Sequence, residues 1–160
     1  RLFVAPFMLL IPGINFAFLP KLSKEFDYYH NKLKKTYFVF YVCIILYTLL
    51  LIPTSNYIFS VIAQDQSGYE NISTLVLIWC AILLSVFFRS QNEISLQSRS
   101  EFKFISHMNF LLSLASLIVI YLFSTIFFVA GALIGLLIIE LILGFSLYSY
   151  FRKKIHGNSS

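Results

Sequence analysis

The chain has 160 residues, of which 59% are hydrophobic and only 12% are charged. Soluble domains carry about 25% charged residues, so this chain has too few charges to cover a water-facing surface. The net charge of +5 would favour binding to nucleic acid if the Lys and Arg residues formed one face. They lie instead in short connectors between apolar runs. That distribution is typical of membrane orientation, and no nucleic-acid partner is expected. Composition therefore predicts an all-α, polytopic transmembrane helix bundle with the lipid bilayer as its partner.

Stretches without formal charge define the predicted spans. A membrane helix needs about 20 mostly apolar residues. The last stretch, 104–151, is interrupted only by Glu140 and is long enough for two helices, with the turn between them in 124–131. One very long helix is the alternative for this stretch. Within a transmembrane bundle at 1–151, the predicted helices lie near 2–19, 36–57, 71–89, 106–125 and 129–150.

The charges in the connectors predict the orientation. Residues 20–35, 89–103 and 152–160 hold eleven of the twelve Lys and Arg residues, whereas 65–70 holds two acids and no base. Five helices place the basic segments on one side of the membrane and the acidic loop on the other. Because Lys and Arg in short loops mark the cytoplasmic side, we expect the tail, 152–160, in the cytoplasm and Arg1 outside.

Glu140 is the most informative single residue, because it lies midway along the last predicted helix. A carboxylate at the centre of a membrane helix costs about 2.5–3.5 kcal/mol and by default faces the bundle interior or a wet cavity. One interpretation is a contact point for a proton or a substrate in a transport path. The other is a carboxyl group that only fixes helix packing.

Other polar residues are candidates for the same path. Asn15 follows Gly13 in the first span and is either an interhelical hydrogen-bonding group or part of a cavity wall. A second group lies at predicted cytoplasmic helix ends and comprises Arg89, Lys103, His107 and Asn109. These residues could receive an anionic headgroup or a pyrophosphate. The alternative is that they are ordinary positive-inside residues.

Gly131 and Gly135 form a small-xxx-small pair at the start of the last helix, where missing side chains let two helices approach closely. We assign them to helix packing. The sequence contains no phosphate loop, paired-His zinc motif or Ser-His-acid set, so it predicts no catalytic residue, metal ligand or cofactor.

Three segments resemble the second half of bacterial polysaccharide (O-antigen type) flippases, in the multidrug/oligosaccharidyl-lipid/polysaccharide superfamily. The first helix opens with Arg1-Leu2 and closes with Phe-Leu-Pro-Lys-Leu-Ser-Lys at 18–24, similar to a Pro-x-Leu-Ser-basic element. Ser-Gly-Tyr-Glu at 67–70, before the apolar run 75–84, resembles a Gly-x-x-Tyr turn with shortened spacing. Residues 131–140 are similar to a Gly-Ala-rich last helix. The likeness spans almost the whole chain, but it rests largely on helix order and loop charge.

The resemblance implies a transporter and not an enzyme. The chain would be the second lobe, without its first helix, of a MATE-like two-lobe protein in the bacterial inner membrane. The lobes would pass an undecaprenyl-pyrophosphate-linked oligosaccharide from the inner to the outer leaflet for surface polysaccharide such as the O-antigen of lipopolysaccharide. The missing N-terminal lobe of the same chain would be its partner and would supply about seven more helices, including one repeat of the present pattern.

Other function classes stay open. A cation-coupled multidrug exporter of the same superfamily would use Glu140 as a coupling site. A membrane enzyme of the same pathway, such as an oligosaccharide polymerase, would be expected to have a large extracytoplasmic loop, whereas the predicted outer loops are short. A purely structural membrane subunit is the third alternative.

Overall fold

The computed structural model describes residues 5–63 and 72–157, which form four helices and no strand. These are α1 (Ala5–Leu22), α2 (Phe26–Ala63), α3 (Ile72–Gln97) and α4 (Phe102–Gly157). Each is long and apolar enough to cross a membrane. The all-α transmembrane architecture predicted from composition is therefore confirmed. The predicted acidic loop at 65–70, with its Gly68–Tyr69 element, and Arg1 lie outside the described residues.

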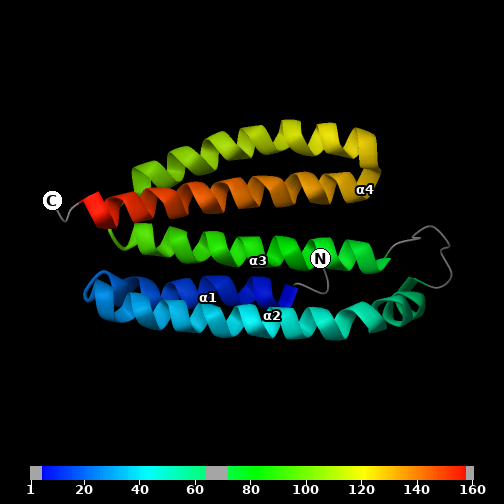
Figure 1. Ribbon diagram of the computed structural model, residues 1–160, viewed down its shortest axis with the longest axis horizontal. Coiled ribbons are helices and arrows are strands. Elements are labelled where there is room, and N and C mark those ends of the chain that lie inside the picture. Colours follow the sequence, from blue (N-terminus) through cyan, green and yellow to red (C-terminus); the bar gives the residue numbers. More distant parts are fainter. Residues whose placement is uncertain (1–4, 64–71, 158–160) are drawn as a thin grey trace.

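Helix α4 is bent back on itself and supplies two antiparallel arms. Phe127 and Phe128 have non-helical dihedral angles, and Phe128 has a positive φ of 52°. This bend lies inside the segment 124–131 predicted for a turn. Figure 1 shows α3 between the α1–α2 pair and the two arms of α4, and α3 packs against all the other helices. The fold is thus a bundle of about five spans, as the sequence predicts.

Helices α2, α3 and α4 extend beyond the predicted spans. We expected connectors at 20–35 and 89–103, but α2 begins at Phe26 and α3 continues to Gln97. The tail predicted from residue 152 is likewise helical as far as Gly157. The helices run beyond the predicted span ends because charge marks what leaves the hydrocarbon, whereas a helix continues wherever its residues favour it. Lys, Glu, Gln and Arg are all good helix formers.

Exposed apolar side chains cover the outside of the bundle. On α2 they include Phe38, Leu49 and Leu50, which are 66%, 62% and 71% exposed, and on α1 they include Phe16 at 86%. The opposite face of α2 is fully buried at Leu33, Tyr37 and Ile44. Large exposed apolar surfaces of this kind mark contact with lipid or another protein. Together with helix length, they indicate a multi-pass protein in a bilayer.

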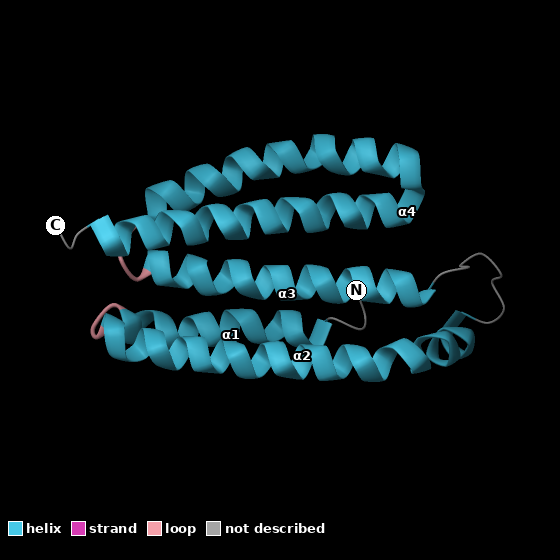
Figure 2. Ribbon diagram, in the orientation of Figure 1, coloured by secondary structure: helices cyan, strands magenta, loops and turns pink. Residues whose placement is uncertain are grey.

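The connectors after α1 and α3 lie at one end of the bundle, which we call the basic end (Figure 2). Here Lys154 Nζ forms an ion pair with Glu101 Oε1, and Tyr150 donates a hydrogen bond of 3.1 Å to Glu101 Oε2. The Arg99 guanidinium lies 4.1 Å above the centre of the Phe26 ring. These contacts join α2 and the end of α4 to the connector between α3 and α4.

The Glu101–Lys154 ion pair makes the stability of the basic end depend on pH. The hydrogen bond from Lys154 holds the pKa of Glu101 below its ordinary value of 4.5. A carboxyl whose pKa is lowered by folding stabilises the fold above its unfolded-state pKa, and this contribution is lost as pH falls through the folded-state value. We expect Glu101→Gln to unfold at a lower temperature than wild type at about pH 7, and the difference to shrink towards about pH 3. Thermal unfolding in detergent at several pH values measures this, and a pH-independent difference would contradict it.

Candidate functional site

An ion pair joins α3 and α4 inside their apolar stretches. Arg89 Nη1 donates a hydrogen bond of 3.0 Å to Glu140 Oε1, and the two side chains are 29% and 13% exposed. A lone charge at this position would be costly, so pairing is the expected state of both groups. The structure thus brings together two of the residues selected from the sequence.

Local packing explains how the two side chains meet. Long side chains on a helix lean towards its N-terminus, so Arg89, in the C-terminal part of α3, extends back towards the middle of the bundle. Gly144 lies one turn after Glu140, and a Cβ atom there would be 2.8 Å from Phe88 Cδ1 and 3.7 Å from the Arg89 nitrogen. The absent side chain therefore lets α4 approach α3 beside the ion pair.

A second carboxylate belongs to the same cluster. Asn109 Nδ2, from the first arm of α4, donates a hydrogen bond of 3.4 Å to Glu93 Oε1. Glu93 lies four residues after Arg89, which puts both on one face of α3. The cluster of Arg89, Glu93, Asn109 and Glu140 therefore contains one base and two acids.

These four residues line one polar cavity of about 230 Å³ between α3 and the two arms of α4. Its other polar residues are Ser113 and Ser116, and the Ser116 hydroxyl donates a 2.7 Å hydrogen bond to the Ser113 carbonyl. Glu140 Oε2 and Arg89 Nε are buried and have no hydrogen-bond partner among the described residues. The cavity thus offers hydroxyl, amide, carboxylate and guanidinium groups among apolar helices.

An apolar groove of about 410 Å³ lies on the other side of Glu140. Its walls come from α1, α3 and the second arm of α4, and include Met8, Trp79 and Val86. Leu136 and Glu140 line both the groove and the polar cavity. Glu140 therefore stands between an apolar and a polar space.

Asn15 belongs to a separate cluster that connects α1, α2 and α3. Its amide nitrogen donates to Ser90 Oγ at 3.1 Å, and its carbonyl oxygen accepts from the Tyr37 hydroxyl at 3.1 Å. The Tyr37 and Ser90 oxygens are 3.0 Å apart. Of the two interpretations open for Asn15, the structure shows the interhelical hydrogen bond, and Asn15 does not line the polar cavity.

Replacing Tyr37 with phenylalanine tests this triad. Tyr37→Phe removes one shared hydroxyl but leaves Asn15 and Ser90 bonded to each other, so we expect a loss of only about 1 kcal/mol. Ser90→Ala leaves Asn15 bonded to Tyr37 in the same way, so we expect a similar loss, whereas the double variant leaves the Asn15 amide without either partner and should cost more than the two single losses together. Chemical unfolding in detergent micelles measures all three variants, and strictly additive losses would contradict a shared hydrogen-bond cluster.

His107 does not share the site. It is exposed on the first arm of α4, two residues before Asn109, and a helix places such positions on nearly opposite faces. The structure does not place His107 in the polar cavity that Arg89 and Asn109 line, and Lys103 is exposed as well. Gly131 and Gly135, assigned to packing, lie where the two arms of α4 approach each other closely.

Glu93, Ser113 and Ser116 line the cavity but were not selected from the sequence. Glu93 was not selected because the predicted third span ends at residue 89. Helix α3 continues beyond this point, and Glu93 lies one helical turn after Arg89. The i,i+4 spacing of an acid and a base was the available signal. The two serines carry no comparable signal, since hydroxyls are common in apolar helices.

No group of three or more potential metal ligands occurs within 5–63 and 72–157. Comparison of the chain with family models, with curated proteins and with solved structures gave no match.

Proposed function

We propose that the chain is part of a bacterial inner-membrane flippase that moves an undecaprenyl-pyrophosphate-linked oligosaccharide from the inner to the outer leaflet. The proposal makes the protein a transporter and not an enzyme. The observation that carries it is the polar cavity between α3 and α4, where Arg89, Asn109 and Glu140 come together inside membrane-length helices. The resemblance to polysaccharide flippases supplies the substrate class.

The chemistry of the substrate explains why such a cavity is needed. A sugar head loses its hydrogen bonds to water when it enters hydrocarbon, at a cost of several kcal/mol per unsatisfied group. The hydroxyls of Ser113 and Ser116 and the amide of Asn109 are replacements of the right type. In the proposed cycle they replace part of the hydration shell while the head crosses the bilayer.

The pyrophosphate needs cationic groups, and Arg89 is the one base in the lining of the polar cavity. Its guanidinium is bound to Glu140, so an anionic head competes with that carboxylate. One base is few for a pyrophosphate. In the proposal, the N-terminal lobe supplies further Arg or Lys residues. The basic end of the bundle faces the cytoplasm.

The test uses the full-length protein in cells that lack their own copy. The double variant Arg89→Met with Glu140→Met leaves no charge unpaired, so it should abolish surface polysaccharide and leave the lipid-linked oligosaccharide on the inner leaflet without loss of folded protein. His107→Gln changes an exposed residue outside the cavity and should behave as wild type. Normal transport by this double variant would overturn the role of the cavity, and normal surface polysaccharide without the protein would overturn the flippase proposal.

A second candidate is an exporter of lipophilic cations, which the apolar groove favours. Its wall contains an indole, at Trp79, and ends at the Glu140 carboxylate. Aromatic and carboxylate groups together suit a flat organic cation. Efflux of ethidium from vesicles, driven by an ion gradient and without any effect on lipid-linked sugar, would select this candidate over the flippase.

A further inference from the structure

A continuous stripe of exposed apolar side chains runs along one face of α2. Val39, Val42 and Leu46 follow the helical spacing and are 57%, 40% and 57% exposed, and Leu50 continues the stripe at 71%. The buried face, which packs against α1 and α3, lies on the other side of the helix. We call Val39, Val42, Leu46 and Leu50 the lipid stripe, since in a bilayer it contacts acyl chains.

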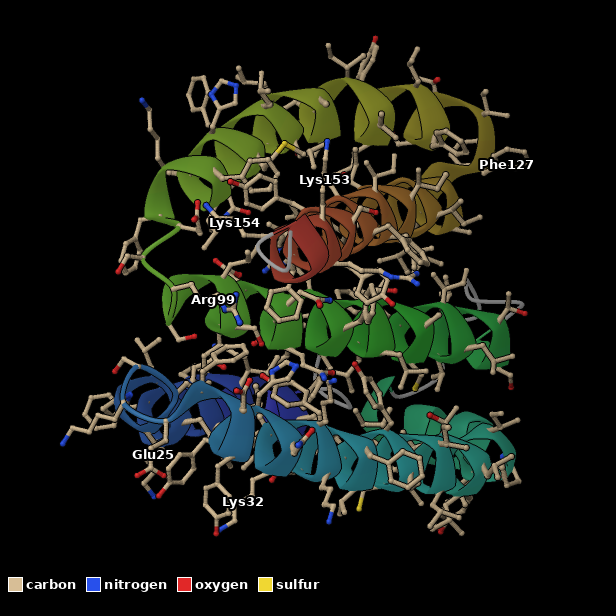
Figure 3. All side chains as sticks on the ribbon, turned by 60° about the vertical axis from the view of Figure 1, so that its left-hand side comes forward. Glu25, Lys32, Arg99, Phe127, Lys153 and Lys154 are labelled. Atoms are coloured by element: carbon tan, nitrogen blue, oxygen red, sulfur yellow. The ribbon has the colours of Figure 1, made fainter. Side chains whose placement is uncertain are left out.

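On the same face of α2, the side chains nearer the N-terminus are polar instead of apolar. Lys35, Lys32 and Tyr28 lie four, seven and eleven residues before Val39, and all three are exposed. Figure 3 shows Lys32 on the outer side of α2, pointing away from the bundle. The two ammonium groups therefore follow the lipid stripe directly, where acyl chains give way to headgroups.

Aromatic rings position Lys32 at this level. Its ammonium nitrogen lies 4.4 Å from the centre of the Tyr28 ring and 5.7 Å from that of Tyr29. Tyrosine rings prefer the headgroup region, because their body is apolar and their hydroxyl is polar. Two rings with this preference therefore lie against the Lys32 ammonium group.

No acid among the described residues forms an ion pair with Lys32 or Lys35. The ion pairs within the described residues are Arg89–Glu140 and Lys154–Glu101, and neither involves α2. Two acids lie nearby in the sequence. Asp27 interacts electrostatically with His30, which lies on the buried side of α2, and Glu25 lies before the first residue of α2. Both ammonium groups are therefore available to an external anion.

We propose that Lys32 and Lys35 bind the phosphate of an anionic phospholipid whose acyl chains lie along the lipid stripe. The ligand class follows from the register: an apolar surface that passes directly into two unpaired cations matches a lipid with a negative headgroup. The site is independent of the transport proposal, since it lies on the outside of α2 and shares no residue with the polar cavity.

The experiment measures binding of phosphatidylglycerol to the full-length protein by native mass spectrometry, with phosphatidylcholine as the neutral probe. The variant is Lys32→Gln with Lys35→Gln. The matched control is Lys34→Gln with Lys153→Gln, which removes the same charge from exposed positions outside this register. Size-exclusion chromatography verifies that each variant is folded, as expected for exposed substitutions.

A lysine near a membrane surface contributes about 1 kcal/mol to binding of anionic lipid, which corresponds to about fivefold in affinity. We therefore expect the Lys32/Lys35 variant to bind phosphatidylglycerol about 25-fold more weakly than wild type, whereas the control stays close to wild type. An equal loss of phosphatidylglycerol binding in the two variants would show general charge attraction and would overturn the proposed site. Unchanged binding in the Lys32/Lys35 variant would also overturn it.

Discussion

Gly131→Val is expected to prevent the chain from folding, because the two arms of α4 meet at this glycine. A Cβ atom on residue 131 would lie 2.0 Å from the carbonyl oxygen and 2.6 Å from the carbonyl carbon of Phe123, both of them backbone atoms. The arms would have to separate next to the bend at Phe127 and Phe128, which removes the packing between them. Fluorescence-detected size-exclusion chromatography should show aggregate in place of a monodisperse peak.

Two other glycines give a graded control. At Gly135 a Cβ would lie 3.2 Å from Ile120 Cα, so Gly135→Ala requires a shift of a few tenths of an ångström and should lower stability only in part. At Gly13 a Cβ has no neighbour within 4 Å, and Gly13→Ala should be neutral or stabilise by about 0.5–1 kcal/mol through helix propensity. If Gly131→Val folded as well as Gly13→Ala, the close approach of the arms would be contradicted.

Removing one partner of the Arg89–Glu140 pair is expected to have the second large effect. Arg89→Met leaves the Glu140 carboxylate, which is 13% exposed, without its counter-charge and close to Glu93. Breaking a buried ion pair costs about 3–5 kcal/mol, because one charge remains buried without compensation. Unfolding of purified protein in detergent, followed by denaturant titration, measures this loss.

The double variant decides whether the loss comes from the pair. Arg89→Met with Glu140→Met removes both charges, and such replacements are often neutral or stabilising. The double variant should therefore be more stable than Arg89→Met alone. If the two single losses simply added, Arg89 and Glu140 would not interact, and the contact of 3.0 Å would not be maintained in solution.

The sequence predicted the number of spans better than their ends. Apolar length placed the turn of the last stretch in 124–131, and the bend is at Phe127 and Phe128. The start of α2 at Phe26 was not predicted, because hydropathy reports the part of a helix inside hydrocarbon and not its polar continuation. A pattern of acids and bases at helical spacing would have been needed to extend α2 and α3.

The candidate site was predicted in its residue types but not in its pairing. A charge in an apolar run singled out Glu140 and predicted that it would face the interior. Its partner is 51 residues away in the chain, so only the packing of α3 against α4 identifies it. His107 shows why closeness in sequence is not enough, since it lies two residues before Asn109 in the chain but on the exposed side of the helix.

Helix α3 carries two adjacent residues that belong to different clusters. Arg89 bonds to Glu140 on α4, whereas Ser90 bonds to Asn15 on α1 and contacts Tyr37 on α2. A rotation of α3 about its own axis would move both side chains in the same sense and disturb both sets of hydrogen bonds together. The two sides of the bundle are therefore linked through α3: a rotation of this helix that breaks the Arg89–Glu140 hydrogen bond also strains the hydrogen bonds of Ser90.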